Sequence, residues 1–165
     1  MASAYTLTNE QAPSYWNADI LWSILADGEK TNGDYALIWE LCPKNSGPSP
    51  HYHDQDESFY IISGAVTFIL DGERMTGSDG TFVHIPKGTV HSFRIDSEKA
   101  EILNSYVPAG FEKTIKLGEK AQKHTLPPKG RPMKASKEET LDLFKKVGMH
   151  IVDSPDVLRD ELKDK

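Results

Sequence analysis

The chain has 165 residues, of which 38% are apolar, and this is enough for one globular domain with a buried core. Its formal net charge of −6 argues against binding to nucleic acids or anionic membranes, which usually requires a basic surface. Residues 1–98 carry 5 Lys/Arg and 14 Asp/Glu, whereas residues 99–165 carry 14 and 11. A basic C-terminal part could therefore lie against an acidic body, although solvated surface is the simpler interpretation.

The sequence also bears on location and redox chemistry. The N-terminus lacks the basic start and apolar run of a signal peptide, and no stretch approaches the roughly 20 apolar residues that span a bilayer, so we expect a cytoplasmic protein. The single cysteine, Cys42, excludes an internal disulfide framework. A buried thiol is the simpler interpretation of Cys42, and a reactive nucleophile is the alternative.

The first half of the chain predicts short strands. Residues 1–19 are expected to form an irregular lead-in. Strands are predicted over Ile20–Leu25 and over residues 35–41, where bulky side chains alternate with others. Residues 43–50 contain several Pro and Gly residues that break the second strand, and a new strand is predicted to begin directly after them at His51.

The strand pattern continues to residue 107. Further strands are predicted at residues 59–62, 66–70, 73–76, 81–85, 91–95 and 100–107, and Asp71-Gly72 is a two-residue hairpin signal. In the strand that starts at His91, the side chains of His91, Phe93 and Ile95 share one face, which we expect to point inward. Short strands separated by turns predict an all-β fold, an antiparallel barrel or jelly roll.

The C-terminal part changes character. We predict that residues 1–115 form the barrel with its lead-in, and that residues 116–165 form a linker and helices packing on the barrel or on a partner. Ser136-Lys137-Glu138-Glu139 is a capping-box pattern, which predicts a helix to about Val147. A second short helix is predicted to start at Ser154-Pro155. The fold class is therefore all-β with a short C-terminal helical extension.

Three histidines and one carboxylate form a candidate metal site. His51 and His53, at positions i and i+2 of an extended strand, point to the same side, and Glu57 follows closely. His91 is the candidate fourth ligand. Imidazoles with a carboxylate suit one divalent transition metal, and Ni, Fe, Mn, Co, Zn and Cu all remain possible. Four ligands leave one or two positions open on a five- or six-coordinate ion, as a catalytic centre requires. The alternative is a set of hydrogen-bonded interior histidines.

The spacing of these residues resembles the two sequence motifs of the cupin superfamily. The first motif matches at His51, His53, Glu57 and Gly64, and the second at Gly80, Pro86, Gly88 and His91. The 15 residues between Gly64 and Gly80 match the short spacing of compact cupins. Two positions depart from the motifs, because Asn45 stands where the family has Gly and Ile95 where it has Asn. The resemblance implies a cupin antiparallel β-barrel and a homodimer.

Within this superfamily, residues 57–61, residues 108–112 and the helical tail resemble quercetin-dioxygenase-like cupins. The resemblance implies a metal-dependent dioxygenase that acts on a flavonol or similar enol-bearing aromatic, with Glu57 as both metal ligand and catalytic base. Only three residues separate His53 from Glu57, rather than four, which could alter the freedom of the carboxylate. The alternatives are a non-catalytic metal-binding or small-molecule-binding cupin and a metal-dependent isomerase or lyase.

Aromatic and aliphatic residues of the strands are candidates for a substrate pocket. Each is individually more consistent with the core, but a small barrel must line its cavity with some of them. They are Leu37, Trp39, Tyr60, Phe68 and Phe93. No Lys or Arg cluster falls on the inward face, which favours an apolar substrate over a sugar phosphate. His84 is expected at the surface, and the partners are expected to be a small-molecule substrate and dioxygen.

Overall fold

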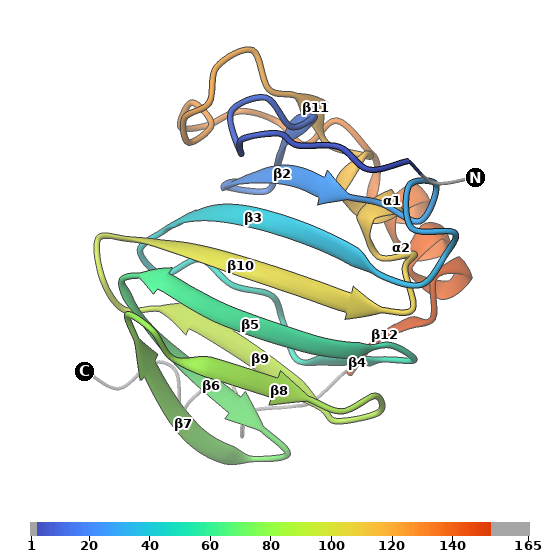
Figure 1. Ribbon diagram of the computed structural model, residues 1–165. Coiled ribbons are helices and arrows are strands. Elements are labelled where there is room, and N and C mark those ends of the chain that lie inside the picture. Colours follow the sequence, from blue (N-terminus) through green and yellow to red (C-terminus); the bar gives the residue numbers. More distant parts are fainter. Residues whose placement is uncertain (1–2, 153–165) are drawn as a thin grey trace.

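The computed structural model describes residues 3–152, which form two antiparallel β-sheets facing each other (Figure 1). The larger sheet contains, in spatial order, β11 (Glu119–Lys120), β1 (Ser14–Asn17), β2 (Ile20–Ala26), β3 (Ala36–Pro43), β10 (Lys99–Val107), β5 (Asp56–Ser63) and β8 (Phe82–Ile85). The smaller sheet contains β12 (Met149–Ile151), β4 (His51–His53), β9 (His91–Ile95), β6 (Ala65–Leu70) and β7 (Glu73–Ser78). The predicted all-β jelly-roll architecture is confirmed.

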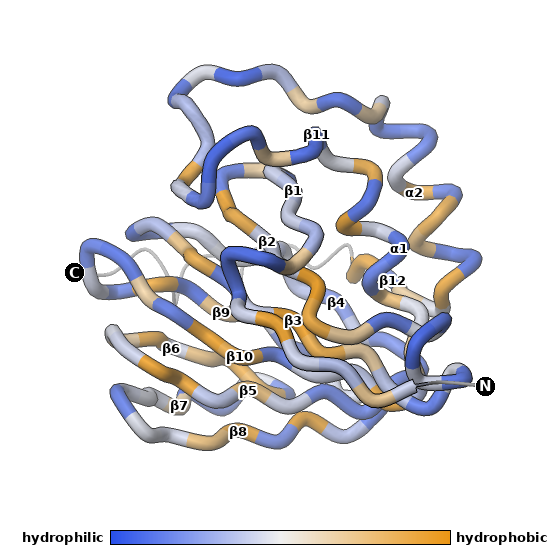
Figure 2. Tube along the Cα trace, turned by 45° about the horizontal axis from the view of Figure 1, so that its top comes forward, coloured by the Kyte–Doolittle hydropathy of each residue, from blue (hydrophilic) through white to orange (hydrophobic). Residues whose placement is uncertain are grey.

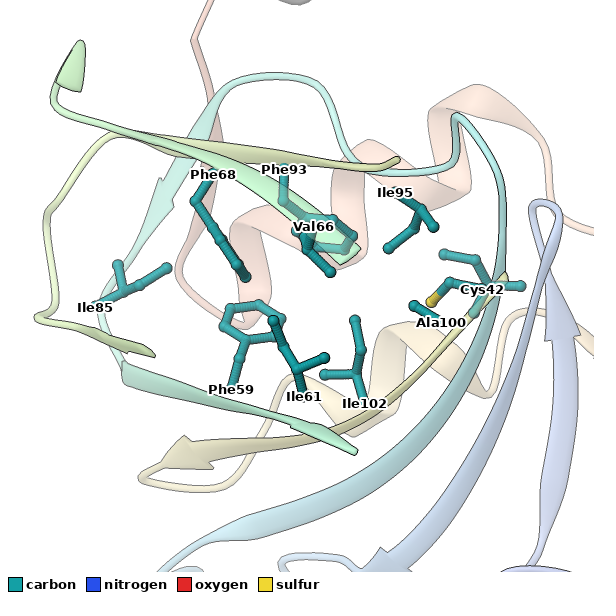
Figure 3. Packing of buried hydrophobic residues seen from close by; sticks show 11 residues of the cluster. Cys42, Phe59, Ile61, Val66, Phe68, Ile85, Phe93, Ile95, Ala100 and Ile102 are labelled. Carbon is teal, nitrogen blue, oxygen red and sulfur yellow. The ribbon is translucent and has the colours of Figure 1, made fainter. Parts of the chain in front are cut away.

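The core lies between the two sheets, because alternate residues of each strand point inward. Three aromatic rings meet at its centre: Phe59 of β5 faces Phe68 and Phe93 of the other sheet, with ring centroids 5.3 and 5.5 Å away (Figure 3). Each such pair contributes about 0.5–1.5 kcal/mol beyond the apolar area that it buries. The remaining members of this cluster are Ile20, Cys42, Ile61, Val66, Ile85, Ile95, Ala100 and Ile102.

The hairpin between β6 and β7 forms as its sequence predicts. Asp71 and Gly72 both have positive φ angles, 48° and 86°, and Leu70 pairs with Glu73 across the turn. Turns of this kind match the twist of the flanking strands, and Asp-Gly is one of the few dipeptides that adopts them without strain. The turn therefore sets the register between β6 and β7, in which Phe68 pairs with Met75.

The glycines of the motifs, and the residue that replaces one of them, are explained by backbone conformation. Gly64 has φ +106°, and a Cβ there would lie 2.8 Å from both the Ala100 Cβ and the Lys99 carbonyl oxygen. Asn45, where the cupin motif has Gly, adopts φ +66°, and Asn tolerates this left-handed region better than most residues. The substitution of Gly by Asn therefore preserves the turn that leads into β4.

Several short elements escaped prediction. The expectation of an irregular lead-in over residues 1–19 was wrong at β1, which pairs with β2 and buries Trp16. The two-residue strand β11, the three-residue strand β12 and helix α1 (Glu112–Ile115) were also not predicted. All four are too short for a hydrophobic period to show in the sequence. The helix predicted from Ser154-Pro155 lies outside the described residues.

The predicted capping box is confirmed. Ser136 caps helix α2 (Lys137–Lys146): its hydroxyl accepts a hydrogen bond from the Glu139 N–H at 3.1 Å, while the Glu139 carboxylate accepts one from the Ser136 N–H. Both helices lie at one end of the sheets, beside β12 (Figure 1). Apolar and polar residues alternate along α2 in the hydropathy view (Figure 2). Neither described helix is long and apolar enough to cross a membrane.

The chain after residue 116 returns to both sheets. β11 pairs with β1 at the edge of the larger sheet, and β12 pairs with β4 in the smaller one. β4 makes only one residue pair with its other neighbour, β9, so β12 provides most of its strand pairing. The strand that carries His51 and His53 is therefore held in place largely by residues near position 150.

Candidate metal centre

Two adjacent strands of the smaller sheet bring the three histidines together. His51 and His53 lie on β4, His91 lies on β9, and His51 pairs directly with His91 in the strand register. One ring nitrogen of each histidine lies within 4.8 Å of the others, and all three side chains are at least 96% buried. The turn of the second motif supports this arrangement, because the Gly88 N–H donates to the His53 carbonyl at 2.9 Å.

Backbone hydrogen bonds fix which ring nitrogen faces the centre. The Nδ1 atoms of His51, His53 and His91 lie 2.9, 2.8 and 2.8 Å from the carbonyl oxygens of Ser49, Gln55 and Thr89. A carbonyl oxygen only accepts hydrogen bonds, so each Nδ1 carries the hydrogen and each neutral ring keeps a lone pair on Nε2. This pattern orients metal-binding histidines in many proteins.

Glu57 reaches the same centre from the opposite sheet. Its Oε2 atom lies 3.0 Å from His53 Nε2 and 2.9 Å from His91 Nε2, and the side chain is 2% exposed. Among the described residues, His91 Nε2 has no well-aligned hydrogen-bond partner despite its burial. Donors bound to one ion at about 2.0–2.2 Å lie roughly 3 Å apart when they are at right angles. The donor set therefore fits a divalent metal.

The protonation of the site follows from burial and from these contacts. Burial lowers the pKa of His51 to about 4, and the nearby His91 adds to this effect. Burial alone would raise the pKa of Glu57, but the adjacent imidazoles of His53 and His91, when they carry a proton on Nε2, outweigh it and hold the pKa below its ordinary range. Burial alone would also lower the pKa of His53, but the Glu57 carboxylate raises it. The centre thus holds an ionised carboxylate beside the histidine nitrogens.

The buried side chain of Asn104 positions the Glu57 carboxylate through the oxygen that does not face the histidines. The side-chain Nδ2 of Asn104 lies 2.9 Å from Glu57 Oε1, 3.0 Å from Glu40 Oε1 and 3.2 Å from the Tyr106 hydroxyl. All four side chains are at least 97% buried. Burial raises the pKa of Glu40 to about 8, with the charge of Glu57 adding to it, so Glu40 is largely a neutral acid at pH 7.

Sequence reasoning missed Glu40 and Asn104, although the strand period contained a signal. Ile38, Glu40 and Cys42 alternate on the inward face of β3, and Ile102, Asn104 and Tyr106 do so on β10. A polar residue on an inward phase between apolar ones needs a buried partner, and two such residues on neighbouring strands can supply one another.

A cavity of about 230 Å³ opens beside the centre. Its inner end contains His51, Glu57 and His91, and most of its other walls are apolar or aromatic. No Lys or Arg is among the residues that line the cavity. Besides His51, Glu57 and His91, the lining consists of Asn17, Ala18, Asp19, Ile20, Trp22, Gly47, Pro48, Phe59, Phe93, Asn104, Tyr106, Phe111, Thr114, Ile115, Met133, Thr140, Phe144 and Met149.

Of the five pocket candidates, the cavity lining includes Phe93 alone. Phe68 is buried in the core, and Tyr60 is 46% exposed on the outer face of β5. Leu37 and Trp39 lie on the outer phase of β3, where Trp39 packs with Trp16 and Leu21. Since Glu57 points inward, strand alternation places Phe59 inside and Tyr60 outside, and this signal in the sequence distinguishes the two.

His84 and Cys42 lie where the simpler interpretation of the sequence places them, at the surface and in the core. His84 is exposed, and its Nδ1 lies 3.2 Å from the Ser58 hydroxyl. Cys42 is buried, its thiol lies 3.7 Å from Glu40 Oε2, and burial raises the pKa of the thiol well above its usual value. A thiol with a raised pKa is a poor nucleophile, so the chemistry of the site does not pass through Cys42.

Comparisons with known proteins agree with this geometry. Residues 37–106 match the family model described as Cupin domain. The chain is 31% identical over 128 residues to a quercetin 2,3-dioxygenase of Bacillus subtilis (strain 168), which covers 76% of this chain but 38% of that protein. The chain therefore spans well under half the length of that relative.

Two solved structures show the same fold at low identity. An RmlC-like cupin from Shewanella frigidimarina NCIMB 400 has TM-score 0.60 and 15% identity, over 67% of this chain and 96% of that one. The polyketide cyclase RemF from Streptomyces resistomycificus has TM-score 0.57 and 12% identity, over 88% of this chain and 99% of that one. Residues 37–106 therefore match a cupin domain, and the described residues have the cupin fold.

Proposed function

We propose that this cupin binds one divalent transition metal through His51, His53, Glu57 and His91, and that it is a dioxygenase acting on a flavonol or a similar enol-bearing aromatic. The observation that carries the proposal is the convergence of buried histidine lone pairs and an ionised carboxylate at the inner end of an apolar cavity. The similarity to the Bacillus subtilis quercetin 2,3-dioxygenase supports the reaction class.

The residues of the chain have separable duties in this reaction. The bound metal would act as a Lewis acid that makes the substrate hydroxyl easier to deprotonate. The aromatic walls, among them Phe59, Phe93 and Phe111, exclude water and hold flat rings by stacking or edge contacts. Glu57 accepts the enol proton as general base. Asn104 holds the other carboxylate oxygen, so Glu57 Oε2 stays directed at the centre.

The ligand assignment is tested by metal content. In His91→Ala we expect most bound metal to be lost, since one of four donors is removed. His84→Ala is the matched control because His84 is an exposed histidine outside the site, and it should keep wild-type occupancy. Elemental analysis of both variants, purified without added metal, measures this. Full occupancy in His91→Ala contradicts the four-ligand assignment.

The reaction is tested by oxygen uptake with a panel of flavonols, on protein reconstituted separately with nickel, cobalt, manganese or iron. For Glu57→Gln we expect a retained fold and turnover reduced by about 10²–10⁴-fold, the usual contribution of a positioned base. An unchanged rate in Glu57→Gln removes the general-base role, and no uptake with any metal removes the dioxygenase.

A metal-dependent cyclase, isomerase or lyase is the second candidate. Two observations favour it: Glu40 offers a neutral carboxylic acid close behind Glu57, and the structural neighbour that covers 88% of this chain is a polyketide cyclase. Turnover of an aromatic or polyketide substrate under nitrogen would identify this class, because it consumes no oxygen. Ligand binding without turnover in air or nitrogen identifies the third candidate, a non-catalytic binding cupin.

The predicted homodimer stays a prediction. The outer face of β5 and β8 offers a surface for it, since Tyr60, Ile62 and Phe82 are 46%, 43% and 63% exposed and Tyr60 pairs with Phe82 across the strands. Light scattering of the wild type and of Phe82→Glu measures the assembly, and a monomeric wild type contradicts it.

A further inference from the structure

The outer wall of the cavity comes from the C-terminal segment. Met133, Thr140, Phe144 and Met149 line the cavity, and His51, His91 and Glu57 line the part of it that adjoins the centre. Helix α2 supplies Thr140 and Phe144 and lies at the end of the two sheets (Figure 1). A substrate that reaches the centre therefore has α2 beside its outer part.

Helix α2 is attached to the barrel mainly at its C-terminal end. The Gln55 side-chain amide donates to the Val147 carbonyl at 2.8 Å, the Asp54 N–H donates to the Gly148 carbonyl at 3.0 Å, and β12 then pairs with β4. Within residues 3–152, the first turn of α2 hydrogen-bonds only within itself and to its cap, and no residue of α2 is buried. The start of α2 is therefore held to the rest of the chain by fewer hydrogen bonds than its end.

Phe144 is the side chain of α2 that faces the aromatic part of the cavity. It packs, partly buried, against the cluster that contains Tyr106, Phe111 and Ile115. Tyr106 and Phe111 stack with centroids 4.2 Å apart, and the Tyr106 hydroxyl reaches Asn104 behind Glu57. Three aromatic side chains that line the cavity, Tyr106, Phe111 and Phe144, thus belong to one cluster that extends from the partner of Asn104 to α2.

The volume of the cavity decides what fits under α2 as it stands. Pockets for drug-sized ligands are usually about 300–1,000 Å³. At about 230 Å³ this cavity suits a compact one-ring or two-ring molecule, and a three-ring flavonol needs either a smaller side chain at position 144 or an outward shift of α2.

We propose that Phe144 is a specificity-determining residue that sets the length of aromatic ligand admitted, and that α2 is a lid that moves to admit longer ones. This inference rests on the proposed function, because it takes an aromatic ligand at the same centre. Phe144 contacts the outer ring of the ligand, so its effect grows with ligand length and is absent for a ligand confined to the inner end.

The test is anaerobic binding of two probes, quercetin with three rings and catechol with one, followed by quenching of protein fluorescence. The measured quantity is the ratio of the quercetin Kd to the catechol Kd at equal metal occupancy. We expect this ratio to fall about tenfold in Phe144→Ala and to rise about tenfold in Phe144→Trp, within the range that one pocket group gives. Leu141→Ala, on the same helix but outside the cavity lining, should keep the wild-type ratio.

The movement of α2 has its own readout. Bound quercetin should change hydrogen–deuterium exchange of the amides of residues 137–141 in the wild type, and catechol should not. A ratio that is the same in all four proteins, an equal effect of both probes on exchange, or no binding of either probe overturns the proposal. Selective binding without oxygen uptake removes the dioxygenase and leaves the lid, whereas oxygen uptake with an unchanged ratio removes the lid and leaves the dioxygenase.

Discussion

Asn104 is the residue on which the orientation of the base depends. One side-chain amide lies within hydrogen-bond distance of two carboxyl groups and a phenol, and all of these side chains are buried. Hydrogen bonds to charged groups contribute about 1.5–3 kcal/mol each, and an unsatisfied buried partner costs a similar amount. The amide therefore affects both the stability of the protein and the direction of Glu57.

Replacing Asn104 tests this dual role. We expect Asn104→Ala to lower the free energy of unfolding by about 2–3 kcal/mol, because Glu57 Oε1 and Glu40 both lose a buried partner. Turnover should fall as well, with little change in metal content, since no proposed ligand is removed. Ser105→Ala, on the outward phase of the same strand, is the control. Urea denaturation and elemental analysis measure these effects, and wild-type stability of Asn104→Ala contradicts them.

Glu40 makes stability depend on pH. Its pKa is about 8 in the folded protein against 4.5 as an ordinary carboxyl, so the folded state binds the proton more tightly. The stability that it contributes is complete below about pH 4.5 and is lost as pH rises through about 8. Glu40→Gln should remove this loss, so the melting temperature of the variant relative to wild type should rise between pH 5 and pH 8. Parallel melting profiles of the two metal-free proteins contradict the assignment.

The sequence predicted the four site residues that belong to the motifs, but not Glu40 and Asn104, which hydrogen-bond behind them. His51, His53, Glu57 and His91 come together because each has a fixed place in a motif. Glu40 and Asn104 meet only after β3, β10 and β5 become neighbours, and the order of strands in a sheet follows from tertiary packing rather than from local spacing.

Among the elements, the connection from β3 to β4 fixes the position of β4, the strand that carries His51 and His53. Asn45 holds a left-handed conformation there, and its N–H donates to the Ile95 carbonyl at 2.9 Å, which ties the connection to β9. At Gly47, two residues on, a Cβ would collide with the Phe93 carbonyl. The backbone between Pro43 and His51 thus lies directly against the strand that carries His91.

The conformation of Asn45 gives a prediction with an internal control. Asn45→Ala should destabilise the fold by about 1 kcal/mol, because a left-handed conformation costs an ordinary L-residue about 1–2 kcal/mol. Asn45→Gly should be close to neutral, since Gly adopts this region freely and is the residue of the cupin motif. Thermal melting of the two variants measures the difference, and equal effects of Ala and Gly contradict the strain argument.

Element length explains which strands the sequence could predict. Most strands from β2 to β10 have four or more residues and a mainly apolar inward phase, so the period-two pattern located them, whereas β7 was located by the Asp71-Gly72 turn before it. β1, β11 and β12 have two to four residues and take their conformation from the partner strand. Helix α2 was predicted because its start signal is local, as a capping box always is.

In the whole molecule, the residues of the candidate metal centre come from both sheets. His51, His53 and His91 belong to the smaller sheet, and Glu57 belongs to the larger one. A metal bound by all four would cross-link the open end of the jelly roll and bind the folded state alone. Metal binding should therefore appear as a gain in stability of the entire fold and not only as activity.

The metal effect is measured by melting with and without the ion. Free metal at 100 times its Kd stabilises by about 2.7 kcal/mol, which corresponds to a rise of roughly 5–10 °C in melting temperature for a domain of this size. A chelator should reverse it. The rise should be much smaller in Glu57→Gln, in which the link between the sheets is weakened, and should be full in His84→Ala. Equal melting temperatures with and without metal contradict a metal site whose ligands come from both sheets.

The pairing of β12 with β4 also has a consequence for the order of events during synthesis. The histidine strand emerges from the ribosome with the first half of the chain, but the strand that completes its pairing is made only after residue 149. Pairing between segments so far apart in sequence is slow to form, because a long loop must close first. The metal centre should therefore mature after translation has passed the barrel, and a nascent chain halted at residue 115 should bind metal poorly even though all four ligands have been made.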